Sequence, residues 1–340
     1  MKLGIVGLSR SGKSTVFEAL THNILPESHK DKNRIGTIHV PDKRLDVLSN
    51  MYKPPKTIYA QVEYFLPDVL RQKKDQKIWT QVRDCDALIH VVRNFGGYGF
   101  EAPTPYQDFQ AIDQELILTD LVVVEKKLEH MELDKKRGKK GDPEELLLLN
   151  QCVEALEKEI PLRNLPDLAS AHLLKGYAFL SAKPMLVLFN NEDDDDGFPD
   201  ITDLTTQENC MVIRGKLEQE LAQMSDEEAE EFLSEFNITA SAMDRVIQRS
   251  YELLGLISFF TLGKDEIKAW TVKRKTPAID AAGVIHTDMQ KGFIRAEVVS
   301  YDDLISAGSY PEARKLGNVR LEGKTYEVQD GDIIEFRFNV

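Results

Sequence analysis

A nine-residue stretch near the start of the chain constrains the fold more than any other feature. Its sequence is Gly7-Leu8-Ser9-Arg10-Ser11-Gly12-Lys13-Ser14-Thr15, which matches the phosphate-loop pattern G-x-x-x-x-G-K-[ST]. An apolar run at residues 3–6 suits a buried strand, and residues 16–20 have the apolar spacing of a helix. A strand, a glycine-containing loop and a helix in this order form the context that the motif requires. The sequence therefore predicts an α/β domain that binds a nucleotide.

The chemistry expected of this loop depends mainly on its backbone. Gly7 and Gly12 permit conformations that turn successive N–H groups toward an anion, and the start of the helix adds partial positive charge. Lys13 supplies a cation for the β- and γ-phosphates, Ser14 offers a hydroxyl to Mg²⁺, and Thr15 supports the α-phosphate side. The predicted nucleotide-binding residues of the loop are Ser9, Arg10, Ser11, Gly12, Lys13, Ser14 and Thr15, with Ser14 as a metal ligand.

The charge of the chain is unevenly distributed. The formal net charge is −14, but residues 1–60 hold 10 Lys+Arg against 5 Asp+Glu, and residues 61–255 hold 21 against 39. This balance argues against general coating of nucleic acid, although a local basic face could still contact RNA. The three cysteines show no disulfide or zinc spacing, and no apolar run approaches a membrane span of about 18 residues. We therefore expect a cytoplasmic protein without a membrane partner.

Strands that alternate with helices predict a doubly wound α/β sheet. The strands are expected at residues 3–6, 58–66, 87–93, 184–189 and 210–213. Between the third and fourth of them, a helical spacing from Ile112 onward leads to a basic turn at residues 134–141. A second helix begins after Asp142, the predicted N-cap, with Glu145 as its reciprocal partner.

The second helix carries a coiled-coil spacing, which predicts a helical hairpin inserted into the α/β domain. The seam residues are Leu146, Leu149, Val153, Leu156 and Ile160. The basic tip of the hairpin has two interpretations. It is either a solvated turn or a contact for RNA, and the sequence leaves both open. From about residue 256 onward the pattern changes to short strands, which predicts a separate α+β unit.

Several segments resemble the YchF/OBG-like P-loop NTPases, which belong to the translation-factor class of GTPases. The C-terminal residues 258–261, 269–272, 281–288, 292–297 and 328–340 resemble the TGS domain of that family, a β-grasp fold. Residues 40–45 resemble its V-P-D-x-R-L segment, and the hairpin resembles its inserted coiled coil. The implied domains are 1–108 with 181–255 for nucleotide binding, 109–180 for the insertion and 256–340 for TGS. The resemblance implies a ribosome-associated protein that hydrolyses ATP or GTP.

The switch elements depart from the family pattern. Where the family has D-x-x-G, this chain has Leu66-Pro67-Asp68-Val69, the loop at residues 71–77 is shortened, and no T-I-E-P-N segment precedes Ile35. Asp68 is the candidate to replace the missing metal-positioning aspartate. These parts place Mg²⁺ and water in phosphoryl transfer, so their loss should impair hydrolysis more than binding. No residue can be named as catalytic.

The base-recognition segment is expected at Asn190-Asn191-Glu192-Asp193, where the family usually has N-x-x-E. The Asp193 carboxylate can accept hydrogen bonds from guanine, which favours GTP and leaves ATP open. The last base-contact loop is expected at Arg214 and Gly215. The predicted base-binding residues are therefore Asn190, Asn191, Asp193, Arg214 and Gly215.

Three functions remain at this point. The first is a translation-associated NTPase with weakened hydrolysis. The second is a non-hydrolysing adaptor that a nucleotide stabilises and that binds ribosomes or proteins through the hairpin and the TGS domain. A small-molecule kinase is a weaker third hypothesis, because the same loop serves kinases but no acceptor site can be identified.

Overall fold

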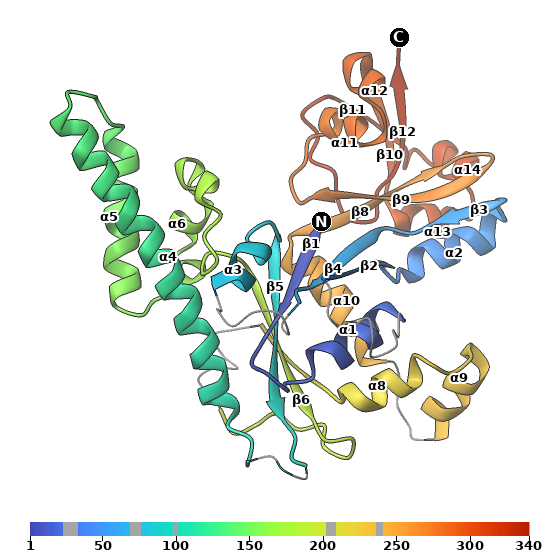
Figure 1. Ribbon diagram of the computed structural model, residues 1–340. Coiled ribbons are helices and arrows are strands. Elements are labelled where there is room, and N and C mark those ends of the chain that lie inside the picture. Colours follow the sequence, from blue (N-terminus) through green and yellow to red (C-terminus); the bar gives the residue numbers. More distant parts are fainter. Residues whose placement is uncertain are drawn as a thin grey trace. The chain divides into compact units, whose positions relative to one another are not determined.

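The computed structural model describes most of the chain (Figure 1). The described residues are 1–22, 33–68, 76–97, 99, 101–201, 209–235 and 241–339. They form two compact units, which we call the N-terminal unit (Met1–Thr37 with Glu63–Val246) and the C-terminal unit (Ile38–Val62 with Ile247–Val340). The sequence had assigned residues 38–62 to the nucleotide-binding domain, whereas the structure groups them with the C-terminal unit.

The first sheet has six strands in the order β2-β4-β1-β5-β6-β7. The strands are β1 (Lys2–Val6), β2 (Arg34–His39), β4 (Gln61–Leu66), β5 (Ala87–Asn94), β6 (Met185–Asn191) and β7 (Asn209–Ile213). The pairs β4–β1, β1–β5, β5–β6 and β6–β7 are all parallel. The central strands are buried apolar runs, as expected for a parallel sheet covered on both faces. This confirms the predicted doubly wound α/β fold.

Helices follow the strands of this sheet in the N-terminal unit. They are α1 (Lys13–Thr21), α3 (Gln76–Val82), α4 (Pro105–Lys136), α5 (Pro143–Glu157), η2 (Leu162–Asn164), α6 (Pro166–Ser170), η3 (His172–Tyr177), α8 (Gly215–Leu221) and α9 (Asp226–Glu235). Helix α10 (Ala242–Leu253) continues from this unit into the other. A core of Val6, Trp79, Val92, Phe109 and Phe189 joins the sheet to α3 and α4. This core includes Val6, the last residue of β1, and the phosphate loop begins at the next residue.

Helices α4 and α5 form the predicted hairpin, seen in green in Figure 1. Asp142 caps α5 as expected, because its carboxylate accepts a hydrogen bond from Glu144 N at 2.9 Å. Two details differ from the prediction. Glu145 does not close a reciprocal cap, since its carboxylate contacts Tyr177 and, at 3.1 Å, Lys127.

The apolar seam of α5 is also shorter than its spacing suggested. Leu149 and Leu156 are buried together with Cys152, but Leu146 and Ile160 are 40% and 37% exposed. Packing against α4 and the following short helices therefore begins one turn inside each end of the predicted seam.

The predicted single strand at residues 58–66 is two strands in two different sheets. β3 (Lys56–Ile58) pairs with the C-terminal sheet, whereas β4 begins at Gln61 and lies in the first sheet. Between them, Ala60 O accepts a hydrogen bond from Val40 N at 2.8 Å. Sequence periodicity could not locate this change, because apolar residues continue through the break.

The second sheet belongs to the C-terminal unit and has the strand order β11-β10-β12-β8-β9-β3. Its other strands are β8 (Leu256–Leu262), β9 (Glu266–Lys273), β10 (Phe293–Val299), β11 (Arg320–Glu322) and β12 (Ile333–Phe338). The helices of the unit are α2 (Lys43–Tyr52), α11 (Ala278–Ile285), α12 (Thr287–Lys291), α13 (Tyr301–Ala307) and α14 (Tyr310–Lys315). The apolar faces of α11 and β8–β10 share one core with β12.

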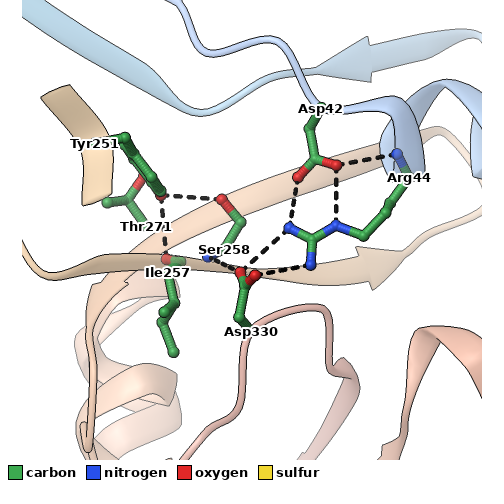
Figure 2. Close-up of polar contacts among 7 residues, drawn as sticks. All are labelled: Asp42, Arg44, Tyr251, Ile257, Ser258, Thr271 and Asp330. Atoms are coloured by element: carbon green, nitrogen blue, oxygen red, sulfur yellow. Dashed lines mark hydrogen bonds and ion pairs between the residues drawn. The ribbon is translucent and has the colours of Figure 1, made fainter. Parts of the chain in front are cut away.

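A polar cluster holds residues 38–62 to this sheet, as Figure 2 shows. The Arg44 guanidinium donates to Asp42 and to Asp330, with distances of 2.9 Å to one oxygen of each carboxylate. Asp330 also accepts from Ser258 N at 3.0 Å, while Tyr251 donates to Ile257 O at 3.1 Å. Burial of the guanidinium acts to lower the pKa of Arg44, but the hydrogen bonds and charges of the two carboxylates together outweigh it and raise the pKa. The segment that resembles V-P-D-x-R-L is thus an anchor of the C-terminal unit.

Candidate nucleotide site

The phosphate loop has the backbone geometry that its glycines predict. Gly7 and Gly12 have φ angles of 148° and 95°, a region that L side chains rarely adopt. A Cβ atom on Gly7 would lie 2.3 Å from Val91 O, and one on Gly12 would lie 2.1 Å from Asn190 Nδ2. The loop is therefore packed too closely at both glycines to accept a side chain there.

Lys13 is the first residue of α1, and its side chain is buried along the loop. The ammonium group donates to Gly7 O at 3.0 Å and to Leu8 O at 2.5 Å. Burial lowers the pKa of Lys13 to about 8, because an ammonium ion loses hydration inside the protein. An anion placed in the loop would compensate for that loss and raise the pKa again.

The hydroxyl groups of the loop differ in their surroundings. Ser14 is exposed and Thr15 is half-buried, whereas Ser11 is buried with its hydroxyl oxygen lacking a hydrogen-bond partner among the described residues. Ser9 and Arg10 are exposed, and Arg10 has a φ angle of 64°. The loop thus presents Ser14 to solvent at the start of α1, where a metal-bound phosphate would lie.

Asn190 connects the phosphate loop to the predicted base-contact loop. It stands near the end of β6 and is 4% exposed. Its Nδ2 atom donates to Ser11 O at 3.1 Å, and its Oδ1 atom accepts from Gly215 N at 2.9 Å. Two segments that are distant in the sequence are therefore joined through one amide group, at the carboxyl edge of the parallel sheet.

The remaining predicted base-site residues gather around the same edge. Asp193 Oδ1 accepts from Leu217 N at 3.2 Å, and Arg214 Nη1 lies 3.5 Å from Asp193 O. Asn191 is buried, donates to Gly197 O at 2.7 Å and accepts from Asn94 Nδ2 at 2.9 Å. The arrangement places Asp193 and Arg214 beside each other, while Asn191 holds the acidic loop that follows β6.

The substituted switch residues begin at the end of β4. Leu66 is 6% exposed and packs as an apolar core residue. Asp68 is half-buried, and its backbone N–H donates to Asn33 Oδ1 at 2.9 Å. Val69, residues 71–75 and residues 23–32, where the switch threonine segment of the family would lie, are outside the described residues.

A buried ion pair positions the loop helix. Arg34 Nη1 on β2 lies 2.8 Å from Glu18 Oε1 on α1, and both side chains are at most 5% exposed. Gln219 on α8 donates to the other Glu18 oxygen at 2.5 Å. These partners come from three separate elements, so no local motif indicated them.

Comparisons with known proteins agree with this geometry. The fold and the loop define a P-loop protein of the NTPase class. The family model YchF-GTPase_C, described as a protein of unknown function (DUF933), matches residues 256–339. The chain is 36% identical to "Ribosome-binding ATPase YchF" of Bacillus subtilis and 37% identical to the protein of that name from Haemophilus ducreyi. These matches cover 99% and 100% of this chain and 99% of each relative.

A solved structure shows the same relationship. The "Structure of the Schizosaccharomyces pombe YchF GTPase" matches with a TM-score of 0.85 at 27% identity, over 99% of this chain and 97% of that one. The chain therefore belongs to the YchF family, as its motifs predicted.

Proposed function

We propose that this protein binds a purine nucleotide, ATP or GTP, with Mg²⁺ and acts in association with ribosomes. The observation that carries the proposal is the bridge formed by Asn190, because it holds the phosphate loop against the predicted base loop at Gly215. A nucleotide that spans these two loops has its phosphates at the start of α1 and its base beside Asp193 and Arg214. Full-length similarity to proteins named ATPases favours this function over a non-hydrolysing adaptor.

The residues present fit a magnesium nucleotide. The loop that carries Lys13 has no room for side chains at its glycines, Ser14 is exposed, and the hydroxyl of Ser11 is unsatisfied among the described residues. Lys13 would exchange its two carbonyl partners for phosphate oxygens, and Ser14 would hold the metal ion. When bound, Mg²⁺ neutralises phosphate charge. Asp68 is the candidate for a second, water-mediated contact with the metal ion.

The same site supports slow hydrolysis. Leu66 occupies the position of the family aspartate and is packed in the core, so it offers the metal ion neither a charge nor an oxygen atom. We propose that Lys13 and the loop N–H groups bind the phosphates while the positioning of water is impaired.

The tip of the helical hairpin is the proposed contact with ribosomal RNA. Four lysines are exposed at the tip: Lys135, Lys136, Lys139 and Lys140. Lys139 Nζ lies 3.0 Å from Asp134 Oδ1. Two relatives are named ribosome-binding, which supports a ribosome as partner and hence a cytoplasmic location. Phosphate contacts by lysines make such binding sensitive to salt.

Calorimetry tests the nucleotide proposal. ATP, ADP, GTP and GDP are titrated with Mg²⁺ into the wild type, Lys13→Ala and the matched control Lys158→Ala, which changes an exposed lysine at the end of α5. We expect binding by the wild type and by the control, and a loss of at least about tenfold in Lys13→Ala. Absence of binding by folded wild type would refute the proposal.

Phosphate release tests hydrolysis and the ribosome partner separately. Release is measured with and without ribosomes, and ribosome co-sedimentation is compared between the wild type and a variant with all four tip lysines changed to alanine. We expect slow release and weaker co-sedimentation of the variant at moderate salt. Release at the uncatalysed rate in both conditions would exclude the active NTPase while leaving nucleotide binding intact.

A further inference from the structure

A groove opens in the C-terminal unit where two neighbouring strands of its sheet separate. Strands β8 and β12 are parallel and, among the described residues, pair at the single register Ile333–Phe260. Both strands continue beyond it, β8 to Leu262 and β12 to Phe338. In Figure 1, β12 runs away from β8 and β9 toward the C-terminus. The space between them belongs to a groove of about 800 Å³.

The backbone groups that face this groove follow from the hydrogen bonds at its ends. Phe260 N donates to Asp332 O at 2.8 Å. The backbone N–H and C=O groups of the even-numbered residues of β12 therefore point toward β8. Asn339 N donates to Gly292 O at 3.0 Å, so the backbone groups of the odd-numbered residues point to the other side, toward β10. The N–H and C=O groups of Phe336 therefore face the groove.

Strand β8 presents the same kind of edge from the opposite side. Ser258 O accepts from Gly331 N at 2.8 Å, so the backbone N–H and C=O groups of the even-numbered residues of β8 point toward β12. Leu262 follows this alternation beyond the last shared register. Unpaired strand edges of this kind are templates for an added strand.

The side chains of the groove suit an extended apolar segment. One wall contains Trp270 and Phe336 together with Ile285 and Met289 of α11 and α12. A second set of lining residues includes Tyr52 and Tyr310, which lie outside the apolar cluster of the first set. Alternate side chains of an inserted strand would contact different lining residues, because successive residues of a strand face opposite sides.

The charges around the groove distinguish a polypeptide from a nucleic acid. Glu266 and Glu335 line it together with one lysine, Lys264. The C-terminal unit, residues 38–62 and 247–340, holds 17 Lys+Arg and 16 Asp+Glu, so its net charge is close to zero. A phosphate backbone would meet net repulsion at these carboxylates, whereas a basic residue beside an apolar strand would be attracted.

We propose that this groove binds an extended peptide segment of a partner protein. The segment adds a strand beside β12, with β-branched apolar side chains in the groove and a lysine or arginine next to them. The backbone edges supply most of the recognition, and the two glutamates select for basic flanks.

The probe is a fluorescein-labelled nonapeptide of alternating valine and threonine with lysine at each end. A twin peptide with the same side chains carries N-methyl groups on alternate amides, which removes the N–H donors along one edge of the strand. Anisotropy is measured on the full chain. We expect saturable binding of the probe and at least tenfold weaker binding of the twin. Equal binding of the two peptides, or no binding of the probe, would overturn the proposal.

Two variants locate the binding. Met289→Lys places a charge on the apolar wall, and its matched control Leu316→Lys changes a side chain that is 67% exposed outside the groove. We expect at least a tenfold loss for Met289→Lys and no change for the control. Glu335→Lys should weaken the lysine-flanked probe by about threefold and strengthen a glutamate-flanked twin. The opposite order would contradict the predicted charge selection.

Amide hydrogen exchange gives a readout that side-chain effects alone would not produce. The bound probe should slow exchange at the amides of Phe336 and Leu262 by at least tenfold. A single-stranded dodecamer of RNA is titrated in parallel. Protection of these two amides by the RNA instead of the peptide would replace the proposed polypeptide with a nucleic acid.

Discussion

Replacing Asn190 by alanine tests whether one amide holds the nucleotide site together. The change removes the donor to Ser11 O and the acceptor for Gly215 N, two bonds of 3.1 Å and 2.9 Å made by a side chain that is 4% exposed. A buried polar group that loses its partner costs about 1–3 kcal/mol. Two backbone groups, Ser11 O and Gly215 N, lose their partner in this variant. Water that enters the space left by the side chain recovers part of this cost, so we expect a loss of about 2–4 kcal/mol in the free energy of unfolding. Nucleotide affinity should fall by at least about tenfold.

The two tryptophans make this loss measurable in one unit at a time. Trp79 lies in the N-terminal unit and Trp270 in the C-terminal unit, and the chain contains no others. In a Trp270→Phe background, urea unfolding followed by fluorescence reports on the unit that contains Asn190. The control Asn150→Ala removes an exposed amide that donates to Leu146 O within α5, and should change stability by less than about 0.5 kcal/mol. Equal unfolding midpoints for Asn190→Ala and this control would refute the bridge as a determinant of the site.

Three further predictions follow from the described contacts. Because burial lowers the pKa of Lys13 to about 8 and bound phosphate should raise it, nucleotide binding should take up a proton above pH 8. Affinity should then be constant well below pH 8 and fall by up to about tenfold per pH unit above it, measured by calorimetry in buffers of different ionisation enthalpy. Asp330→Ala removes one of the two carboxylate partners of Arg44 and the acceptor for Ser258 N. Because Asp330 is partly exposed, we expect a loss in the lower part of the range of about 1–3 kcal/mol in the free energy of unfolding of the C-terminal unit, followed by the fluorescence of Trp270. Gly12→Ala places a Cβ atom 2.1 Å from Asn190 Nδ2, at a residue whose φ angle is 95°. This clash and the backbone strain should lower the free energy of unfolding of the N-terminal unit by about 2 kcal/mol or more, and calorimetry should detect no nucleotide binding.

The sequence was sufficient for those features that local patterns specify. The phosphate loop needs glycines at fixed positions and a lysine at the start of a helix, so Gly7, Gly12 and Lys13 could be recognised without a structure. Asp142 was identified as a cap because capping depends on residues within one turn. The motifs also predicted membership of the YchF family, which the comparisons confirmed.

Features that depend on distant partners could not be predicted in this way. Glu145 has the correct spacing for a capping box, but Tyr177 and Lys127 compete for its carboxylate. Asn190 is predicted to contact the base, and the structure adds a role that local patterns do not indicate, because its amide joins two loops. The division of residues 58–66 between two sheets follows from pairing with β9, which lies more than 200 residues later in the chain.

The placement of residues 38–62 changes how the substituted switch should be understood. The chain leaves the first sheet through β2, is held in the C-terminal unit by Arg44 and Asp330, and returns through the six residues of β4. The substituted switch begins at Leu66, the last residue of that strand. A nucleotide-driven movement there would have to pull on a short strand whose start is anchored and whose end is packed in the core. The predicted replacement of the switch aspartate and glycine and the anchoring of β4 therefore lead to the same expectation: triphosphate and diphosphate should bind to a similar backbone.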